Sequence, residues 1–265
     1  MPASETTVPD SLDSAKLRAF RAASVALAPL LRRVDGAVYG SWSIRLQTGA
    51  VRRLPADLDV EIGLVAGSDA QDCVALLEGT GTLTVRRAQL VSFSSRSADA
   101  PVVFRVLTSV DLGQGSFADL LLGVKMLQTP STMRALVPVS DAEREELLPV
   151  LPLEWCIAQK IARLSLKRSM GRSHTRWRDA IDLYDLIAGE AAVSGTPQLA
   201  SAIVDEWSRR GDGRTPSLCS PPEEWLDHWD EACFLDGVVR PTPRQAIDAI
   251  NDGVAAILAS SLPGS

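Results

Sequence analysis

The spacing of hydrophobic positions changes early in the chain and separates a first helix from a set of strands. Between residues 11 and 33 apolar side chains recur every three or four positions, which predicts an amphipathic helix that Ser11 can cap. Beyond residue 36 the apolar residues alternate or form short runs, which is typical of strands. The predicted strands are 37–39, 58–64, 83–91, 102–107 and 117–124, with glycine-containing turns such as 79–81 and 111–115 between them.

Helical spacing returns after Pro152 and continues through the last third of the chain. The predicted helices are 153–167, 177–188, 197–209, 222–235 and 243–258. Ser220 and Thr242 each precede proline, which is a common way to begin a helix. We therefore expect an α/β (α+β) fold in which a mixed sheet is followed by a helical bundle. The expected division is a polar tail at 1–10, a core at 11–128 and a helical domain at 129–265.

Composition excludes several classes of protein. The 265 residues are 46% hydrophobic and 23% charged, as in a globular chain rather than a disordered or collagen-like one. No apolar run approaches the roughly 20 residues that span a bilayer, and the first ten residues lack the regions of a signal peptide. Four widely spaced cysteines and two histidines indicate neither a zinc site nor a disulfide framework. We expect a cytoplasmic protein without a membrane segment.

Acidic residues and a glycine-serine turn mark the first candidate site. Asp57 and Asp59 are two apart at a predicted strand, so both carboxylates can lie on one face and share a divalent cation. A solvated surface pair is the alternative. Upstream, Gly40-Ser41 follows a strand, and such a turn can hold a phosphate through backbone N–H groups and a hydroxyl. A plain turn is again the alternative.

A third acid would complete a metal site. Asp119 lies in an otherwise apolar strand, where a carboxylate must reach the strand edge, be paired or bind a metal. Asp111 is the competing candidate, although the sequence around it favours a turn.

The charge distribution marks a second candidate site. From Trp155 to Arg178 there is no acid, and the net charge of −6 leaves −13 on the rest of the chain once these bases are removed. The seven bases are Lys160, Arg163, Lys167, Arg168, Arg172, Arg176 and Arg178. A local positive surface on an acidic protein suits a triphosphate or an RNA backbone, although a solvated basic helix is the alternative. Asp179 and Asp182 share one helical face beside it and can orient a nucleotide or close an ion-pair network.

Two motifs in this order resemble a known family. Gly40-Ser41 followed by Arg53-Leu-Pro-Ala-Asp57-Leu-Asp59 is similar to the start of the nucleotidyltransferase AbiEii/AbiGii toxin family, with Pro55 where a serine is usual. Ala-Gln-Lys160 followed by Thr-Arg-Trp-Arg178-Asp179 and Asp182 is similar to its second motif, in a form that resembles mycobacterial members that modify transfer RNA. The resemblance covers roughly residues 35–190. It implies that the core at 11–128 has a nucleotidyltransferase-like fold.

The resemblance also implies a role for each matched residue. Asp57, Asp59 and Asp119 would hold Mg²⁺, and Asp119 could accept the proton of the attacking hydroxyl. Gly40 and Ser41 would cradle the nucleotide phosphates, and Lys160 would contact the triphosphate. Arg178, Asp179 and Asp182 would line the nucleotide side of the cleft. An RNA partner would use the remaining bases of the segment, which are Arg163, Lys167, Arg168, Arg172 and Arg176.

The preferred interpretation is an NTP-dependent, Mg²⁺-dependent nucleotidyltransferase toxin of an AbiE-like toxin–antitoxin system. Its acceptor would be RNA, with a tRNA 3′ end favoured, and its partner would be a separate antitoxin protein. One alternative keeps the enzyme class but moves the nucleotide to a protein or small-molecule hydroxyl. Another is a non-catalytic relative that binds nucleotide or RNA.

Overall fold

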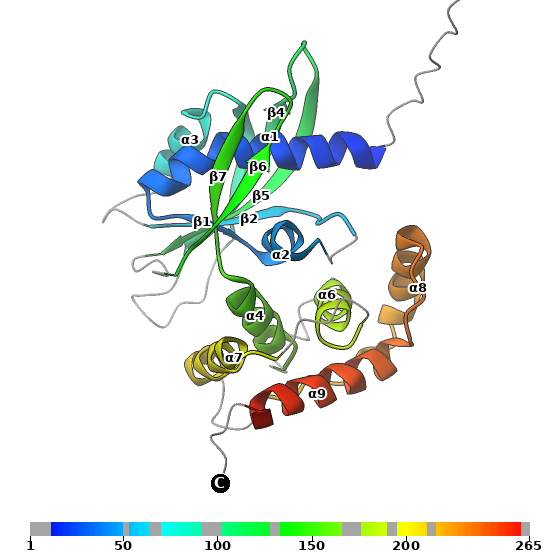
Figure 1. Ribbon diagram of the computed structural model, residues 1–265. Helices are drawn as coiled ribbons and strands as arrows, with labels where there is room; N and C mark the ends of the chain where they lie inside the picture. The colour runs from blue at the N-terminus through cyan, green and yellow to red at the C-terminus, as the bar shows by residue number, and fades with distance from the viewer. Residues whose placement is uncertain are drawn as a thin grey trace, which may run out of the picture. The chain divides into compact units, whose positions relative to one another are not determined.

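A computed structural model describes residues 12–49, 53–63, 70–91, 102–127, 133–165, 176–189, 195–210 and 216–260. The chain divides into two compact units (Figure 1). The sheet unit comprises residues 1–39 and 54–150, and the helical unit comprises residues 40–53 and 151–265. These units differ from the expected core at 11–128 and helical domain at 129–265 in two places. Residues 135–140 and 145–150 pair with the sheet, and residues 40–48 belong to the helical unit.

Seven described strands form one mixed sheet in the order β3-β4-β5-β2-β1-β7-β6. They are β1 (Ala37–Tyr39), β2 (Leu58–Gly63), β3 (Leu83–Val91), β4 (Val102–Asp111), β5 (Phe117–Leu127), β6 (Ala135–Ser140) and β7 (Glu145–Val150). β2 runs parallel to β5 and antiparallel to β1, and β1 runs parallel to β7. The pairs β3–β4, β4–β5 and β6–β7 are antiparallel. The central strand β2 therefore lies between β5 and β1.

The two faces of the central strands differ in chemistry. Even-numbered residues such as Val38, Val60 and Val124 are almost completely buried and apolar. Helix α1 (Leu12–Arg33) packs against β4 to β7 and runs across the strands (Figure 1). Its Leu31 lies close to Gly36 together with Ile62 of β2, so α1 covers the apolar face. The odd-numbered face carries the polar residues of β2. Helix α3 (Ala70–Glu78) packs against β3.

Helices make up the second unit. They are α2 (Gly40–Thr48), α4 (Leu153–Ser165), α6 (Trp177–Ile187), α7 (Pro197–Arg210), α8 (Trp225–Asp236) and α9 (Pro243–Ser260). The predicted start of α9 is confirmed: Thr242 Oγ1 accepts a hydrogen bond from the Gln245 N–H, and Gln245 Oε1 accepts one from the Thr242 N–H. Among the described residues, no helix combines the length and apolar character needed to cross a membrane.

The predicted mixed α/β fold is confirmed, although four of its elements were not anticipated. α2 and α3 are short, and α2 begins at a Gly-Ser pair that is typical of a turn. β6 and β7 contain Pro138 and Pro149, which weaken a strand pattern because proline cannot donate a ladder hydrogen bond.

Candidate active site

The hydroxyl of Ser41 in α2 lies at the centre of a charged cluster in the helical unit. It donates a hydrogen bond to Asp182 Oδ2 at 2.6 Å. The same oxygen accepts hydrogen bonds from Arg53 Nη2 at 3.0 Å and Lys160 Nζ at 3.2 Å. Gly40, the first residue of α2, has a φ of +75°, which glycine adopts without strain. The glycine thus permits the turn that delivers Ser41 to the cluster.

Two helices bring opposite charges together in this cluster. Asp179 and Asp182 are one turn apart on α6, and Lys160 lies on α4. Lys160 Nζ is 2.5 Å from Asp179 Oδ1 and 3.0 Å from Asp182 Oδ2. Arg53 binds both oxygens of Asp182, with Nε at 2.9 Å and Nη2 at 2.7 Å, in the bidentate geometry of a guanidinium fork. Asp182 is completely buried and Lys160 is 2% exposed, so the protein itself fixes this network.

Cations outnumber carboxylates here. Arg176 Nη1 lies 3.0 Å from Asp179 Oδ2, and Arg163 acts on the same carboxylate electrostatically. Burial raises the pKa of Asp179, but the cations, with Lys160 foremost, outweigh burial and hold that pKa well below its ordinary value. With Arg53, four cations act on two carboxylates. The surplus of positive charge suits an anionic ligand such as a triphosphate.

The same interactions keep the buried groups ionised. Burial raises the pKa of Asp182, but Arg53 and then Lys160 lower it below its ordinary value. Burial lowers the pKa of Lys160, but Asp179 and Asp182 together raise it above its ordinary value. Lys160 therefore stays protonated at neutral pH and can act as a fixed positive charge but not as a general base.

The predicted acidic pair lies in the sheet unit, at the beginning of β2. Asp57 directly precedes the strand, and Asp59 lies between Tyr39 of β1 and Gly123 of β5. A Cβ atom at Gly123 would collide with Asp59 Oδ1, so the carboxylate of Asp59 lies over this glycine. Asp57 and Asp59 are both half-buried. Because Mg²⁺ is commonly held by one or two carboxylates together with substrate phosphates, the pair fits a magnesium–nucleotide complex.

The expected third acid, Asp119, lies on β5, the strand beside β2, two residues before the position level with Asp57. Asp119 lies four residues before Gly123 on β5, about 13 Å along the strand from the position opposite Asp59. It is exposed and lies opposite Ser109 of β4. Its Oδ1 atom is 3.7 Å from Nε of Arg86. Strand register, which the pattern of a single strand does not reveal, sets this offset from Asp59. Among the described residues, no group of three or more His, Cys, Asp or Glu side chains could hold a metal ion.

The residues expected to bind RNA are described only in part. Three of them lie outside the described residues: Lys167, Arg168 and Arg172. Arg163 is half-buried on α4, and Arg176 pairs with Asp179. The guanidinium of Arg178 lies 5.1 Å from the centre of the Trp177 ring, at the start of α6. The structure thus brings Arg163 and Arg176 to the charged cluster, whereas Arg178 rests on its neighbouring ring.

Sequence reasoning assigned no role to two cations that the structure places beside the predicted residues. Arg53 could have been found, since it opens the Arg-Leu-Pro-Ala-Asp-Leu-Asp motif. The Nζ atom of Lys125, on β5, lies 3.8 Å from Oε2 of Glu61 on β2 and 5.6 Å from the centre of the Tyr39 ring. The indication of Lys125 in the sequence was weaker. Glu61 continues the two-residue spacing of Asp57 and Asp59, so one more acid lies on that face of β2 and favours a basic partner.

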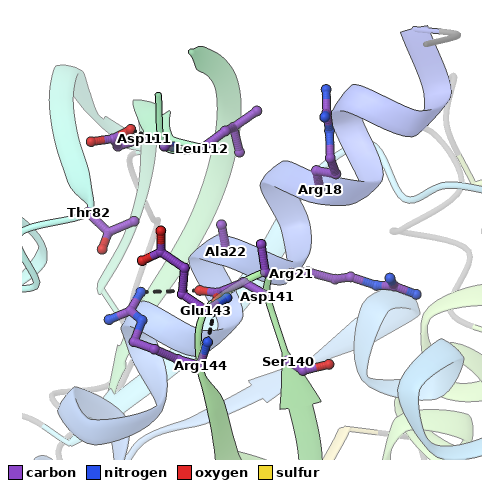
Figure 2. A pocket seen from close by; sticks show the side chains of 12 residues that line it. Arg18, Arg21, Ala22, Thr82, Asp111, Leu112, Ser140, Asp141, Glu143 and Arg144 are labelled. Carbon is purple, nitrogen blue, oxygen red and sulfur yellow. Dashed lines mark hydrogen bonds and ion pairs between the residues drawn. The ribbon is translucent and has the colours of Figure 1, made fainter. Parts of the chain in front are cut away.

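The sheet unit also has a pocket of about 540 Å³ that contains none of these residues (Figure 2). Its walls are α1 and the turns between β4 and β5 and between β6 and β7. Its charged lining residues are Arg18, Arg21, Arg144, Asp111, Asp141 and Glu143. Asp111 is the last residue of β4 and accepts a hydrogen bond from the Gly113 N–H at 2.8 Å, at the turn that the sequence indicates. The balance of charges gives this pocket no preference for a polyphosphate.

The family model for the nucleotidyl transferase AbiEii toxin of type IV toxin–antitoxin systems matches residues 36–255, a range that includes every motif residue above. The chain belongs to the AbiEii family. This AbiEii-family chain is therefore a nucleotidyltransferase, and the family implies an NTP substrate and an antitoxin partner. It is also similar to an antigenic nucleotidyltransferase-like protein from Paracoccidioides brasiliensis, with 16% identity and a TM-score of 0.41, over 77% of this chain and 91% of that chain. No curated protein matches it.

Proposed function

We propose that this AbiEii-family toxin is a Mg²⁺-dependent enzyme that transfers a nucleoside monophosphate from an NTP to an RNA, with a tRNA 3′ end as the acceptor. The observation that carries the proposal is the buried cluster of Ser41, Arg53, Lys160, Asp179 and Asp182. Arg163 and Arg176 also act on Asp179, so four cations face two carboxylates. A rigid positive site of this kind stabilises the charge of a triphosphate without reorganising.

The residues described above would have separate roles in the proposed reaction. Asp57 and Asp59 would hold Mg²⁺, which supplies charge neutralisation at the nucleotide phosphates when it is bound. Gly40 and Ser41 would bind phosphate oxygens through the first turn of α2. Lys160 would supply positive charge, while Arg53, Asp179 and Asp182 fix its position. We assign the metal to Asp57 and Asp59 and leave Asp119 out of the ligand set.

The chemistry needs little more than positioning and electrostatics. A hydroxyl oxygen of the acceptor forms a bond to the α-phosphorus as the bond to the bridging oxygen breaks, and pyrophosphate leaves with the electron pair. The proton of the hydroxyl goes to solvent or to a carboxylate. The buried cations cannot take this proton, because Lys160 is held in its charged form.

The basic segment supports RNA as the acceptor. Seven bases and no acid lie between Trp155 and Arg178, on a chain whose net charge is −6. Such a segment lowers the free energy of a bound phosphate backbone, and the effect weakens as salt rises. The neutralising partner would be the separate antitoxin of the type IV system, and the activity would be cytoplasmic, where NTPs and tRNA are found.

The test uses purified protein, Mg²⁺, total RNA and each of the four α-³²P-labelled NTPs. The proposal expects label on tRNA with at least one NTP, abolished by Asp57→Ala. Arg144→Met, which alters an exposed ion pair of the sheet unit, is a matched control and should label normally. NTP binding without label on any RNA would contradict the RNA acceptor.

A protein or small-molecule hydroxyl is the second candidate acceptor. The charge of −13 outside the basic segment favours it, because an acidic surface repels RNA. Mass spectrometry of cell extract after incubation with the enzyme and NTP distinguishes the two, since this alternative expects the added nucleotide mass on a protein or metabolite and none on RNA.

A further inference from the structure

A cation that the family motifs do not include lies on the same face of the sheet as Asp59. Lys125 is two residues beyond Gly123 on β5, so Lys125 and Gly123 share a face of the sheet. Gly123 is the residue over which the Asp59 carboxylate lies, and Lys125 is opposite Glu61. The odd-numbered face of β1, β2 and β5 therefore presents the carboxylates of β2 and the ammonium of Lys125 together.

The ammonium of Lys125 lies near residues of both β2 and β1. In the sheet order β2 lies between β5 and β1, and yet Lys125 Nζ lies 5.6 Å from the centre of the Tyr39 ring on β1. Tyr39 is the direct partner of Asp59, and Lys125 Nζ is also 3.8 Å from Glu61 Oε2. The Lys125 ammonium thus lies near Glu61 and near the ring of Tyr39, the residue paired with Asp59.

Glu61 forms an ion pair with Lys125. Glu61 is 2% exposed. Its second oxygen, Oε1, lies 3.4 Å from Nη1 of Arg134, the residue before β6. Arg134 is itself held by the carbonyl oxygens of Asp35 and Gly36. Two cations therefore act on this one buried carboxylate. The Lys125 side chain is 15% exposed, so it is not sealed in the core.

We propose that Lys125 binds the phosphate chain of the Mg²⁺–nucleotide complex at the Asp57–Asp59 strand, and that Glu61 positions it. The complex carries negative charge beyond what Mg²⁺ neutralises, and pyrophosphate gains charge as it leaves. An ammonium fixed beside the metal ligands stabilises that charge. The inference rests on the proposed function, because it assumes that the nucleotide binds at this strand.

The test is equilibrium binding by calorimetry, which does not depend on turnover. The probe is the magnesium complex of a nucleoside triphosphate with a methylene group between the α- and β-phosphorus atoms, offered with each of the four bases. Lys125→Met should weaken its binding by about tenfold or more, as expected for a lost charge-assisted contact, and Lys125→Arg should restore most of the affinity. Glu61→Gln should give an intermediate loss.

Lys16→Met is the matched control. Lys16 on α1 has a similar contact with an aromatic ring, 5.9 Å from the centre of Phe20, but belongs to the helix that covers the opposite face. It should bind the probe like wild type. Mn²⁺ alone should bind Lys125→Met at least as tightly as wild type, because a cation beside the carboxylates has been removed.

Three results decide the matter. If wild type binds the probe and Lys125→Met binds it equally well, with only a lower melting temperature, Lys125 is a structural residue and the inference is overturned. Weaker Mn²⁺ binding by Lys125→Met would also overturn it, since the carboxylates themselves would then be disturbed. Failure of wild type to bind the probe with any base would contradict the proposed function instead.

Discussion

Replacing Arg53 by methionine tests whether the charged cluster is a fixed unit. Arg53 contributes two hydrogen bonds to Asp182, at 2.9 and 2.7 Å, and Asp182 is completely buried. Removing one partner of a buried ion pair costs about 3–5 kcal/mol, because the other charge stays buried. Lys160 and Ser41 still contact Asp182, so we expect the lower end, about 3 kcal/mol, in the free energy of unfolding.

The assay is urea unfolding monitored by far-ultraviolet circular dichroism, with a double-mutant cycle. Asp182→Asn removes the charge that Arg53 neutralises, so the double variant should lose less than the sum of the single losses, with a coupling of about 2 kcal/mol. Arg144→Met is the control, since its ion pair with Asp141 is exposed and should contribute less than about 1 kcal/mol. The reasoning is refuted if Arg53→Met costs no more than Arg144→Met, or if the two single losses simply add.

Three further predictions follow from the same contacts. The pKa values of Asp179 and Asp182 are lowered in the folded chain, so the stability they contribute is present above about pH 4 and is lost as pH falls below it; Asp182→Asn should flatten this acid limb of a stability–pH curve, and an unchanged limb would contradict the shift. Gly123→Ala should displace the Asp59 carboxylate. Mn²⁺ binding, measured by electron paramagnetic resonance, should then weaken at least about fivefold while the melting temperature changes by only a few degrees. Unchanged binding would show that Asp59 is not a ligand. Burial raises the pKa of the Cys156 thiol to about 11, so iodoacetamide at pH 8 should modify this residue only in urea, as peptide mass spectrometry would show, and fast labelling of the native protein would contradict its burial.

The long helices could be predicted from the sequence because their apolar spacing is regular over many residues. Helix α1 (Leu12–Arg33) and helix α6 (Trp177–Ile187) begin and end within one residue of the prediction. The strands β6 and β7 could not, since each contains a proline and is only six residues long. Their partners are also remote, because β7 pairs with β1 more than a hundred residues earlier in the chain.

The sequence motifs predicted most residues of the charged cluster, but they did not predict the contacts between those residues. Ser41, Lys160, Asp179 and Asp182 were expected at one site, and the structure brings them within hydrogen-bond distance. Arg53 was recognised only as the first residue of a motif. Nothing in the local sequence shows that its side chain contacts Asp182, which is 129 positions away.

The expectation for Asp119 depended on the register of β5 against β2. An apolar strand with one acid identifies a candidate ligand, but the position opposite Asp59 is set by pairing along the whole strand. That position is occupied by Gly123, which makes room for the carboxylate of Asp59 rather than adding another.

The most direct test of nucleotidyl transfer to RNA compares the fate of two phosphates of one NTP. The enzyme is incubated with Mg²⁺, total RNA and an NTP labelled with ³²P at either the α- or the γ-phosphate, and pyrophosphate release is measured in parallel. The account predicts α-label at the 3′ end of tRNA, no γ-label on RNA, and one pyrophosphate released for each nucleotide added. Gamma-label on RNA, or α-label found on protein and absent from RNA, would contradict it.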